Sequence, residues 1–130
     1  MEIKTVLITG ATSGIGKACA CKFAKEGWNL ILNARDTSKL EKLKAELEGA
    51  YGVRVYILPF DVRDRKLAAA SLESLPEEWK AIDVLVNNAG LVIGVDKEFE
   101  GSLDEWDIMI DTNIRGLLAM TRLVVPGMVE

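Results

Sequence analysis

Short apolar runs alternate with longer amphipathic stretches along this chain of 130 residues. The apolar runs predict strands at Thr5–Thr9, Asn29–Ala34, Arg54–Phe60 and Val84–Asn87. Between these runs, apolar residues recur every three or four positions, which is the spacing of one face of a helix. Helices are therefore expected at Gly14–Glu26, from near Ser38 to the glycines at 49 and 52, at Arg63–Leu75 before Pro76, and from Ser102 toward Val125.

The first helix is predicted to bury one apolar face. The residues that recur at helical spacing on this face are Ile15, Ala18, Cys19 and Phe23. Gly27 is expected to end the helix, because glycine readily adopts the left-handed conformation of a C-terminal cap. The only cysteines, Cys19 and Cys21, point to different sides of such a helix, so no disulfide between them is expected.

The second helix carries a capping signal and a leucine stripe. Ser38 and Glu41 have the spacing of a capping box, which predicts the start of the helix. The stripe expected to face the core is formed by Leu40, Leu43 and Leu47.

Strands and helices that alternate in this way predict a parallel sheet covered by helices on both faces. We expect an α/β fold with a doubly wound, Rossmann-like sheet. Its four strands should lie in the order 3-2-1-4, with the remaining strands of such a sheet missing.

Composition and charge exclude several classes of function. Hydrophobic residues make up 49% of the chain and charged residues 28%, as in a globular protein. The net charge of −4 offers no basic surface, so neither nucleic acid nor a membrane is expected as a partner. No apolar run reaches the ~18 residues of a spanning helix, and the first residues lack a signal-peptide pattern, so a cytoplasmic location is expected. The chain has no histidine, and no metal site is expected.

A glycine-rich turn of the form Gly-x-x-x-Gly-x-Gly follows the first predicted strand. Gly10 allows a sharp exit from the strand, Gly14 lets backbone N–H groups approach a pyrophosphate, and Gly16 lets helix and strand pack closely. Thr12 and Ser13 add hydroxyl groups that can bind phosphate or cap the helix. The alternative is an ordinary turn, which the position at the first strand-helix junction of an alternating chain disfavours.

The end of the second strand bears on the choice of cofactor. An NAD-dependent enzyme places Asp or Glu there to accept a hydrogen bond from the ribose 2′-hydroxyl, whereas this chain has Arg35. A guanidinium binds a 2′-phosphate through charge-assisted hydrogen bonds, so Arg35 favours NADP(H). Asp36 weakens this inference, and a solvated arginine at a strand end is the alternative.

Three motifs occur in order along the chain. They are Thr-Gly-x-x-x-Gly-x-Gly from Thr9, Asp61-Val62 after the third strand, and Asn87-Asn88-Ala89-Gly90 after the fourth. Together they resemble the short-chain dehydrogenases/reductases. The resemblance covers the whole chain and implies the amino-terminal, cofactor-binding half of a longer enzyme. Residues 1–130 are accordingly interpreted as one dinucleotide-binding domain that is incomplete on its C-terminal side.

A narrower resemblance suggests a substrate class. Residues 75–79, 111–113 and 120–130 are most similar to the NADP-dependent 3-hydroxy acid dehydrogenases that oxidise serine or allo-threonine. This similarity implies an oxidoreductase that transfers hydride between NADP(H) and a small hydroxy acid or alcohol.

The family resemblance also implies roles for individual residues. The positions expected to bind the cofactor are Gly10, Thr12, Ser13, Gly14, Ile15, Gly16, Arg35, Asp61, Val62, Asn88, Ala89 and Gly90. Asp61 and Val62 should border the adenine, with the carboxylate facing its exocyclic amine, although a purely buried role for Val62 remains open. The segment 88–90 should hold its loop against the ribose and also stabilise the sheet. Asn113 should orient a water in the proton relay to a catalytic lysine, with solvent exposure as the alternative.

The residues that would complete catalysis are absent from the sequence. Hydride transfer needs a proton acceptor beside the substrate hydroxyl, yet neither Tyr51 nor Tyr56 is followed four positions later by lysine. Residues 1–130 alone are therefore expected to be inactive, with the catalytic tyrosine and lysine of the parent enzyme lying further on. The alternative hypothesis is a non-catalytic dinucleotide-binding half-domain or fragment.

Apolar surface on the last helix suggests association. This helix should start at Ser102, where Glu105 completes a second capping box, and end before Pro126 and Gly127. Its apolar residues are Leu117, Leu118, Met120, Leu123 and Val124. Together with an open edge on the fourth strand, they predict self-association into a homo-oligomer if residues 1–130 are the whole molecule. The three tryptophans, Trp28, Trp79 and Trp106, are expected to be packing residues.

Overall fold

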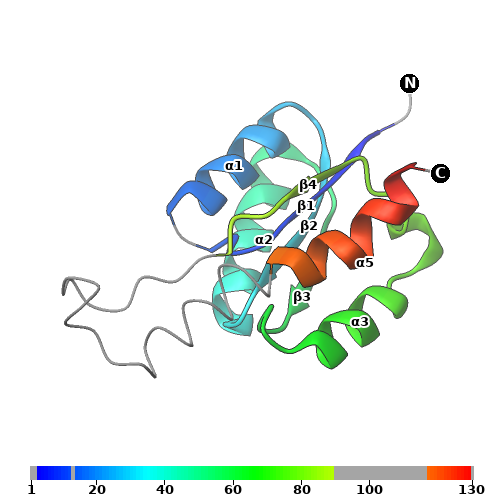
Figure 1. Cartoon of the computed structure of the whole chain (residues 1–130). Helices are drawn as coiled ribbons and strands as arrows, with labels where there is room; N and C mark the ends of the chain where they lie inside the picture. The colour runs from blue at the N-terminus through cyan, green and yellow to red at the C-terminus, as the bar shows by residue number, and fades with distance from the viewer. Residues whose placement is uncertain (1–2, 13, 90–116, 130) are drawn as a thin grey trace.

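The computed structural model describes residues 3–12, 14–89 and 117–129. Within these residues four parallel strands form one sheet in the order β3-β2-β1-β4, which confirms the predicted fold class (Figure 1). The elements are β1 (Thr5–Ile8), α1 (Gly14–Lys25), β2 (Asn29–Ala34), α2 (Thr37–Tyr51), β3 (Val55–Pro59), α3 (Arg65–Glu73), the 3-10 helix η1 (Glu77–Trp79), β4 (Val84–Val86) and α5 (Leu117–Val129).

Helices cover both faces of the sheet. Figure 1 shows α1 and α2 on one side of the strands and α3 and α5 on the other. Along β1, Val6 and Ile8 belong to the apolar cluster beneath α1 and α2, while Leu7 belongs to the cluster beneath α3 and α5. In β2, Ile31 likewise faces the opposite way from its two leucine neighbours. This alternation is expected of strands that are buried on both faces.

Small side chains bring α1 close to the sheet. Its buried residues lie four positions apart and are Gly16, Ala20 and Ala24. Ile15 is 73% exposed and Ala18 is also exposed, so the prediction that they form the buried face is wrong. Cys19 and Phe23 are partly buried against the core, as predicted. The prediction from apolar spacing failed for the buried face of α1, because the close approach of helix and strand requires small residues there rather than large ones.

The end of α1 is a Schellman motif centred on Gly27. The Gly27 N–H donates to the carbonyl of Ala24, and the Trp28 N–H donates to the carbonyl of Phe23. Gly27 has a φ of 87°, which an L-residue with a side chain rarely adopts. The rings of Phe23 and Trp28 meet edge to face with centroids 5.0 Å apart. The predicted cap is therefore confirmed, and Trp28 is a packing residue.

The second helix begins earlier than its sequence suggests. The N-cap is Asp36, whose carboxylate accepts from the Lys39 N–H at 3.2 Å, so the capping box expected at Ser38 is wrong. An aspartate side chain is an effective N-cap and takes this role one residue before the helix starts. The predicted leucine stripe is buried, and Gly52 is the C-cap, whereas Gly49 lies inside the helix.

The segment between β3 and β4 is more broken than predicted. Asp64 caps α3, which spans Arg65–Glu73 and is shorter at both ends than expected. The 3-10 helix that follows was not anticipated, and it buries Trp79 to 4% exposure, which confirms a packing role for this tryptophan. Local capping by Asp64 and the proline at 76 set these boundaries.

The last helix runs further than predicted. It continues through Pro126 to Val129, although it was expected to end before the proline. One missing N–H so near the end of a helix removes a single backbone bond without stopping the helix. Met120 and Val124 are buried, whereas Leu118 is 59% and Leu123 39% exposed. The predicted start at residue 102, the side chain of residue 117 and the tryptophan at 106 lie outside the described residues.

Both cysteines in α1 are free, in agreement with the prediction that they form no disulfide. None of the helices described between residues 3 and 129 has the length and apolar character needed to cross a membrane.

A buried asparagine ties the ends of β2 and β3 together. Asn33 is 1% exposed, and its Nδ2 donates to the carbonyl oxygens of Leu58 and Phe60, each at 3.0 Å. These bonds add to the parallel ladder, in which Asn33 lies opposite Leu58. The asparagine side chain thus adds two buried hydrogen bonds between the ends of the two strands.

We expect Asn33→Ala to lower the free energy of unfolding by about 2–3 kcal/mol, because it removes two buried hydrogen bonds and leaves a cavity. Urea unfolding of the full-length natural protein measures this loss. Asn29→Ala is the matched control, because the Asn29 side chain accepts one bond, from the exposed Arg54 N–H, and its loss should cost about 1 kcal/mol or less. Equal losses for the two variants would contradict the role given to Asn33.

Candidate functional site

The strand order places a topological switch point between β1 and β4. From β1 the chain moves outward to β2 and β3, and it then returns to β4 on the other side of β1. In open parallel sheets, ligands bind outside the carboxyl ends of the strands at such a point. The glycine-rich turn follows β1 there, and the segment 87–89 follows β4 (Figure 1).

The hydroxyl of Thr9 joins these two loops. Its Oγ1 accepts hydrogen bonds from the backbone N–H groups of Asn88 at 3.0 Å and Ala89 at 2.9 Å. The same hydroxyl donates to the carbonyl of Val86 at 3.4 Å. All the hydrogen-bonding capacity of the hydroxyl is therefore used, and Thr9 is 1% exposed.

Glycines are required where the two loops touch. The Asn88 side chain donates to the carbonyl of Gly10 at 3.1 Å. A Cβ on Gly10, which has a φ of 61°, would lie 2.9 Å from the Cα of Ala89, and a Cβ on Gly16 would collide with the Gly10 carbonyl and the Asn88 amide. Gly10 and Gly16 therefore allow close approach, as the sequence predicted for a sharp exit and tight helix packing.

The glycine-rich turn is also fixed to β2. The Ala11 N–H donates to the carbonyl of Asn33 at 3.0 Å, and the Asn33 side chain continues the connection to β3. The turn thus lies between the ends of β2 and β4, with hydrogen bonds to both sides.

Gly14 and Ile15, two further predicted residues of the turn, are exposed. Gly14 begins α1 and is exposed, and a Cβ added to it would meet no described atom within 4 Å. Ile15 is 73% exposed and Thr12 is half-buried. The N–H groups of a first helical turn attract anions. The predicted site residues Ser13, Gly90 and Asn113 lie outside the described residues.

Arg35 and Asp36 have different roles at the end of β2. Arg35 directly follows the last residue of the strand and is exposed. The Asp36 carboxylate is turned into the first turn of α2, where it caps the helix at the Lys39 N–H. The carboxylate that weakened the inference of NADP(H) from Arg35 is thus engaged in a structural bond.

Asp61 is held in place by Arg63. Its Oδ1 accepts from the backbone N–H of Arg63 at 2.9 Å and from Nε at 3.2 Å, and its Oδ2 accepts from Nε at 3.0 Å and Nη2 at 2.8 Å. Partial burial opposes ionisation of Asp61, but these hydrogen bonds and the charges of Arg63 and Arg35 outweigh it. They hold the pKa of the carboxyl below its usual value.

Two further residues have clear structural roles. Val62 is 4% exposed and belongs to the apolar cluster beneath α3 and α5, so its side chain is a core residue. Asn87 donates from Nδ2 to the Thr121 hydroxyl at 3.0 Å, which links the loop after β4 to α5.

Four side chains that hold this edge of the sheet were not among the predicted site residues: Thr9, Asn33, Arg63 and Asn87. Asn33 carried a signal, since it is a polar residue within an otherwise apolar strand, and a buried polar group needs partners. The Asp-x-Arg spacing of residues 61 and 63 was also visible. Nothing in the sequence around Thr9 predicted that its hydroxyl bonds to Asn88 and Ala89.

The sheet order and the joined loops define a doubly wound α/β protein with a glycine-rich turn at its switch point. Comparison with known proteins gives the family: the model of the short chain dehydrogenases matches residues 4–130, and the chain belongs to this family. The resemblance inferred from the motifs is thereby confirmed.

Similar proteins include NADP-dependent 3-hydroxy acid dehydrogenases and a serine dehydrogenase. The chain is 46% identical over 125 residues to the NADP-dependent 3-hydroxy acid dehydrogenase YdfG of Escherichia coli (strain K12), covering 96% of this chain and 49% of the relative. It is 50% identical over 127 residues to the NADP-dependent 3-hydroxy acid dehydrogenase of Schizosaccharomyces pombe, covering 97% and 49%. The solved closed form of a serine dehydrogenase complexed with NADP+ superposes with a TM-score of 0.88 at 46% identity, covering 96% of this chain and 49% of that one. The chain thus spans about half the length of the curated relatives it matches.

We expect Thr9→Val to lower the free energy of unfolding by about 2 kcal/mol, because valine has a similar shape but leaves the Asn88 and Ala89 N–H groups without their acceptor. Thr9→Ser is the matched control. It keeps the hydroxyl, so the free energy of unfolding should fall by less than about 1 kcal/mol. Urea unfolding compares the two. A serine variant as unstable as the valine variant would argue against the hydroxyl as the joining group.

The Asp61–Arg63 pair predicts a pH dependence. The pKa of Asp61 is lower in the folded than in the unfolded protein, so ionised Asp61 contributes stability above the ordinary aspartate pKa of about 3.9. This contribution is lost as the pH falls through the folded-state pKa. We expect Asp61→Asn to be less stable than the wild type at pH 7 and to approach it as the pH falls below about 4, measured by urea unfolding across this range. A stability difference that does not change with pH would refute the ion pair.

Proposed function

We propose that the chain is the cofactor-binding half of an NADP-dependent oxidoreductase that transfers hydride between NADP(H) and a small hydroxy acid or alcohol. The observation that carries the cofactor choice is the end of β2. Arg35 is exposed there, while the neighbouring Asp36 caps α2. An NAD-dependent site would offer a carboxylate at this end to the ribose 2′-hydroxyl. Family membership and the NADP-dependent relatives support the same cofactor.

The described residues fit a dinucleotide along the carboxyl edge of the sheet. Gly10 and Gly16 keep the turn low between β1 and α1, and Gly14 leaves the start of the helix open to a pyrophosphate. Arg35 would bind the 2′-phosphate, Asp61 would accept from the adenine amine, and the loop of Asn88 would lie beside the ribose. Thr12, Ser13, Ile15, Val62, Ala89 and Gly90 complete the proposed set.

The bound cofactor would supply the hydride acceptor or donor. In the described residues, the chain's contribution is to bind and orient this group, because the loops after β1 and β4 are already joined through Thr9. The proton acceptor that hydride transfer needs is not found as a Tyr-x-x-x-Lys pair in the sequence. We place it in the part of the enzyme that follows, with Asn113 orienting a water in the relay.

A second candidate function is a half-domain that binds the dinucleotide without turnover. The feature that fits it is the pair of loops joined through Thr9, which would hold a dinucleotide without a proton acceptor beside it. An assay of NADP+ reduction with serine or another 3-hydroxy acid, on the full-length natural protein, separates the two. Turnover supports the oxidoreductase, and NADPH binding without turnover supports the half-domain.

Assembly and location are further parts of the proposal. Among the described residues, Leu118 and Leu123 of α5 are exposed apolar side chains. Exposed apolar side chains on one helix favour a homo-oligomer. A cytoplasmic location belongs to the same proposal.

We expect Arg35→Ala to weaken NADPH binding at least about tenfold while changing NADH binding less than about threefold, because the lost charge-assisted bonds serve only the 2′-phosphate. Fluorescence titration of the full-length natural protein with each cofactor measures both. Arg54→Ala is the matched control. Arg54 precedes β3 and so lies at the amino ends of the strands, away from the carboxyl ends where Arg35 lies, and its loss should affect neither cofactor. Equal losses for NADPH and NADH would overturn the assignment of Arg35.

A further inference from the structure

Arg63 binds the Asp61 carboxylate through both its side chain and its backbone. Three contacts from its guanidinium and one from its backbone N–H reach both carboxylate oxygens at 2.8–3.2 Å. Both side chains remain partly accessible, at 32% for Arg63 and 25% for Asp61. The pair therefore lies at the surface, where its charges act on whatever binds beside it.

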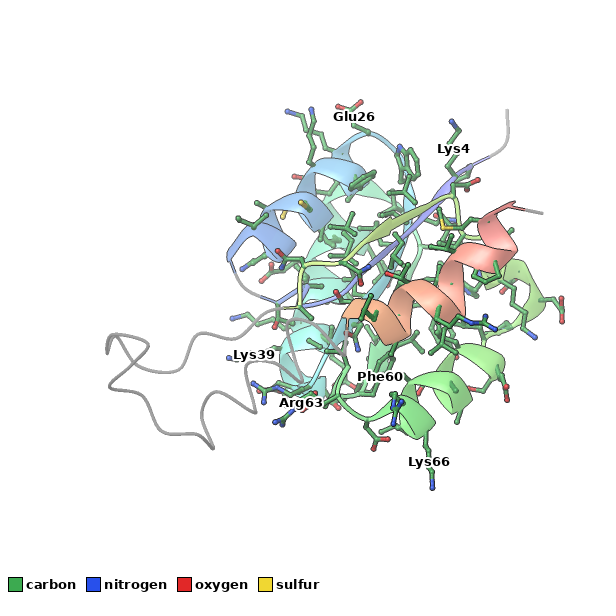
Figure 2. The ribbon with its side chains drawn as sticks, in the orientation of Figure 1. Lys4, Glu26, Lys39, Phe60, Arg63 and Lys66 are labelled. Atoms are coloured by element: carbon green, nitrogen blue, oxygen red, sulfur yellow. The ribbon has the colours of Figure 1, made fainter. Side chains whose placement is uncertain are left out.

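The pair lies beside Arg35. In the parallel ladder Ala34 is opposite Pro59, and the Phe60 N–H donates to the Ala34 carbonyl at 3.1 Å. Arg35 directly follows Ala34 at the end of β2, and Asp61 follows Phe60, two positions beyond the end of β3. The positive charge of Arg35 contributes to the lowered pKa of the Asp61 carboxyl, after the larger effects of Arg63. Figure 2 shows Arg63 at the surface of the molecule.

This arrangement creates an electrostatic conflict for an NADP site. A 2′-phosphate bound at Arg35 carries negative charge, and the Asp61 carboxylate is a like charge at the neighbouring strand end. An unpaired carboxylate would repel the phosphate but not the ribose hydroxyl of NAD(H), which has no such charge. The Asp36 carboxylate poses a smaller conflict because the N-terminal end of α2 stabilises its charge.

We propose that Arg63 is a positioning residue for cofactor selectivity: by binding Asp61 through both oxygens, it fixes the carboxylate for the adenine and neutralises its charge beside the 2′-phosphate. This proposal rests on the proposed function, since it assumes NADP(H) bound along this edge. Arginine suits the role because its planar, permanently charged fork matches a carboxylate, whereas lysine provides a single point charge.

The quantity to measure is the ratio of the dissociation constants for NADH and NADPH in the full-length natural protein. Arg63→Ala should lower this ratio at least about tenfold, because the exposed carboxylate then repels only the cofactor with the 2′-phosphate. Adding Asp61→Asn to this variant removes the repelling charge. The double variant should return to within about threefold of the wild-type ratio, even if both cofactors bind more weakly.

Three other outcomes would overturn the proposal. If Arg63→Ala weakens both cofactors equally, Arg63 is merely structural and the proposal fails. If the ratio falls but Asp61→Asn does not restore it, Arg63 binds the phosphate directly and the proposal also fails. If the wild type itself does not prefer NADPH, the proposed NADP function fails first and this inference falls with it. Arg63→Gln replaces Arg63→Ala in the same comparison if the alanine variant does not fold.

Discussion

The hydroxyl of Thr9 joins the two loops of the candidate site, because it accepts two backbone hydrogen bonds from the loop after β4. Through it the end of β1 holds the backbone of Asn88 and Ala89, and the Asn88 side chain returns a bond to Gly10. These contacts leave no room for a side chain at Gly10 or Gly16, so the glycines follow from the joined loops. A binding edge fixed before a ligand arrives loses less conformational entropy on binding.

Charge along the same edge is arranged so that its carboxylates are engaged within the protein. Asp36 caps α2 and Asp61 is bound by Arg63, while Arg35 stays exposed. The surface that remains at the ends of β2 and β3 is therefore suited to an additional negative group. Under the proposed function, this arrangement would connect the local capping of a helix to the choice between two cofactors that differ by one phosphate.

Much of the fold was predictable because its signals are local. The alternation of apolar runs gave the strand order, the leucines of α2 gave its buried face, and Gly27 gave the end of α1. The prediction failed where tertiary contacts overrode local spacing. Ile15 and Ala18 lie on the outside of α1 because only Gly16, Ala20 and Ala24 permit close packing, and Asp36 took the cap expected of Ser38.

The same division holds for the candidate site. The motifs placed the glycines, Arg35, Asp61 and Asn88 at one edge of the sheet, since carboxyl ends of parallel strands meet there. The partners that hold them, Thr9 to Ala89 and Arg63 to Asp61, depend on distances that only the folded chain sets. The most direct test of the joined loops is amide hydrogen exchange of Asn88 and Ala89 in the full-length natural protein without cofactor. We predict exchange far slower than in an unstructured peptide, although neither residue lies in a helix or strand. Exchange at the unprotected rate would show that Thr9 does not join the loops.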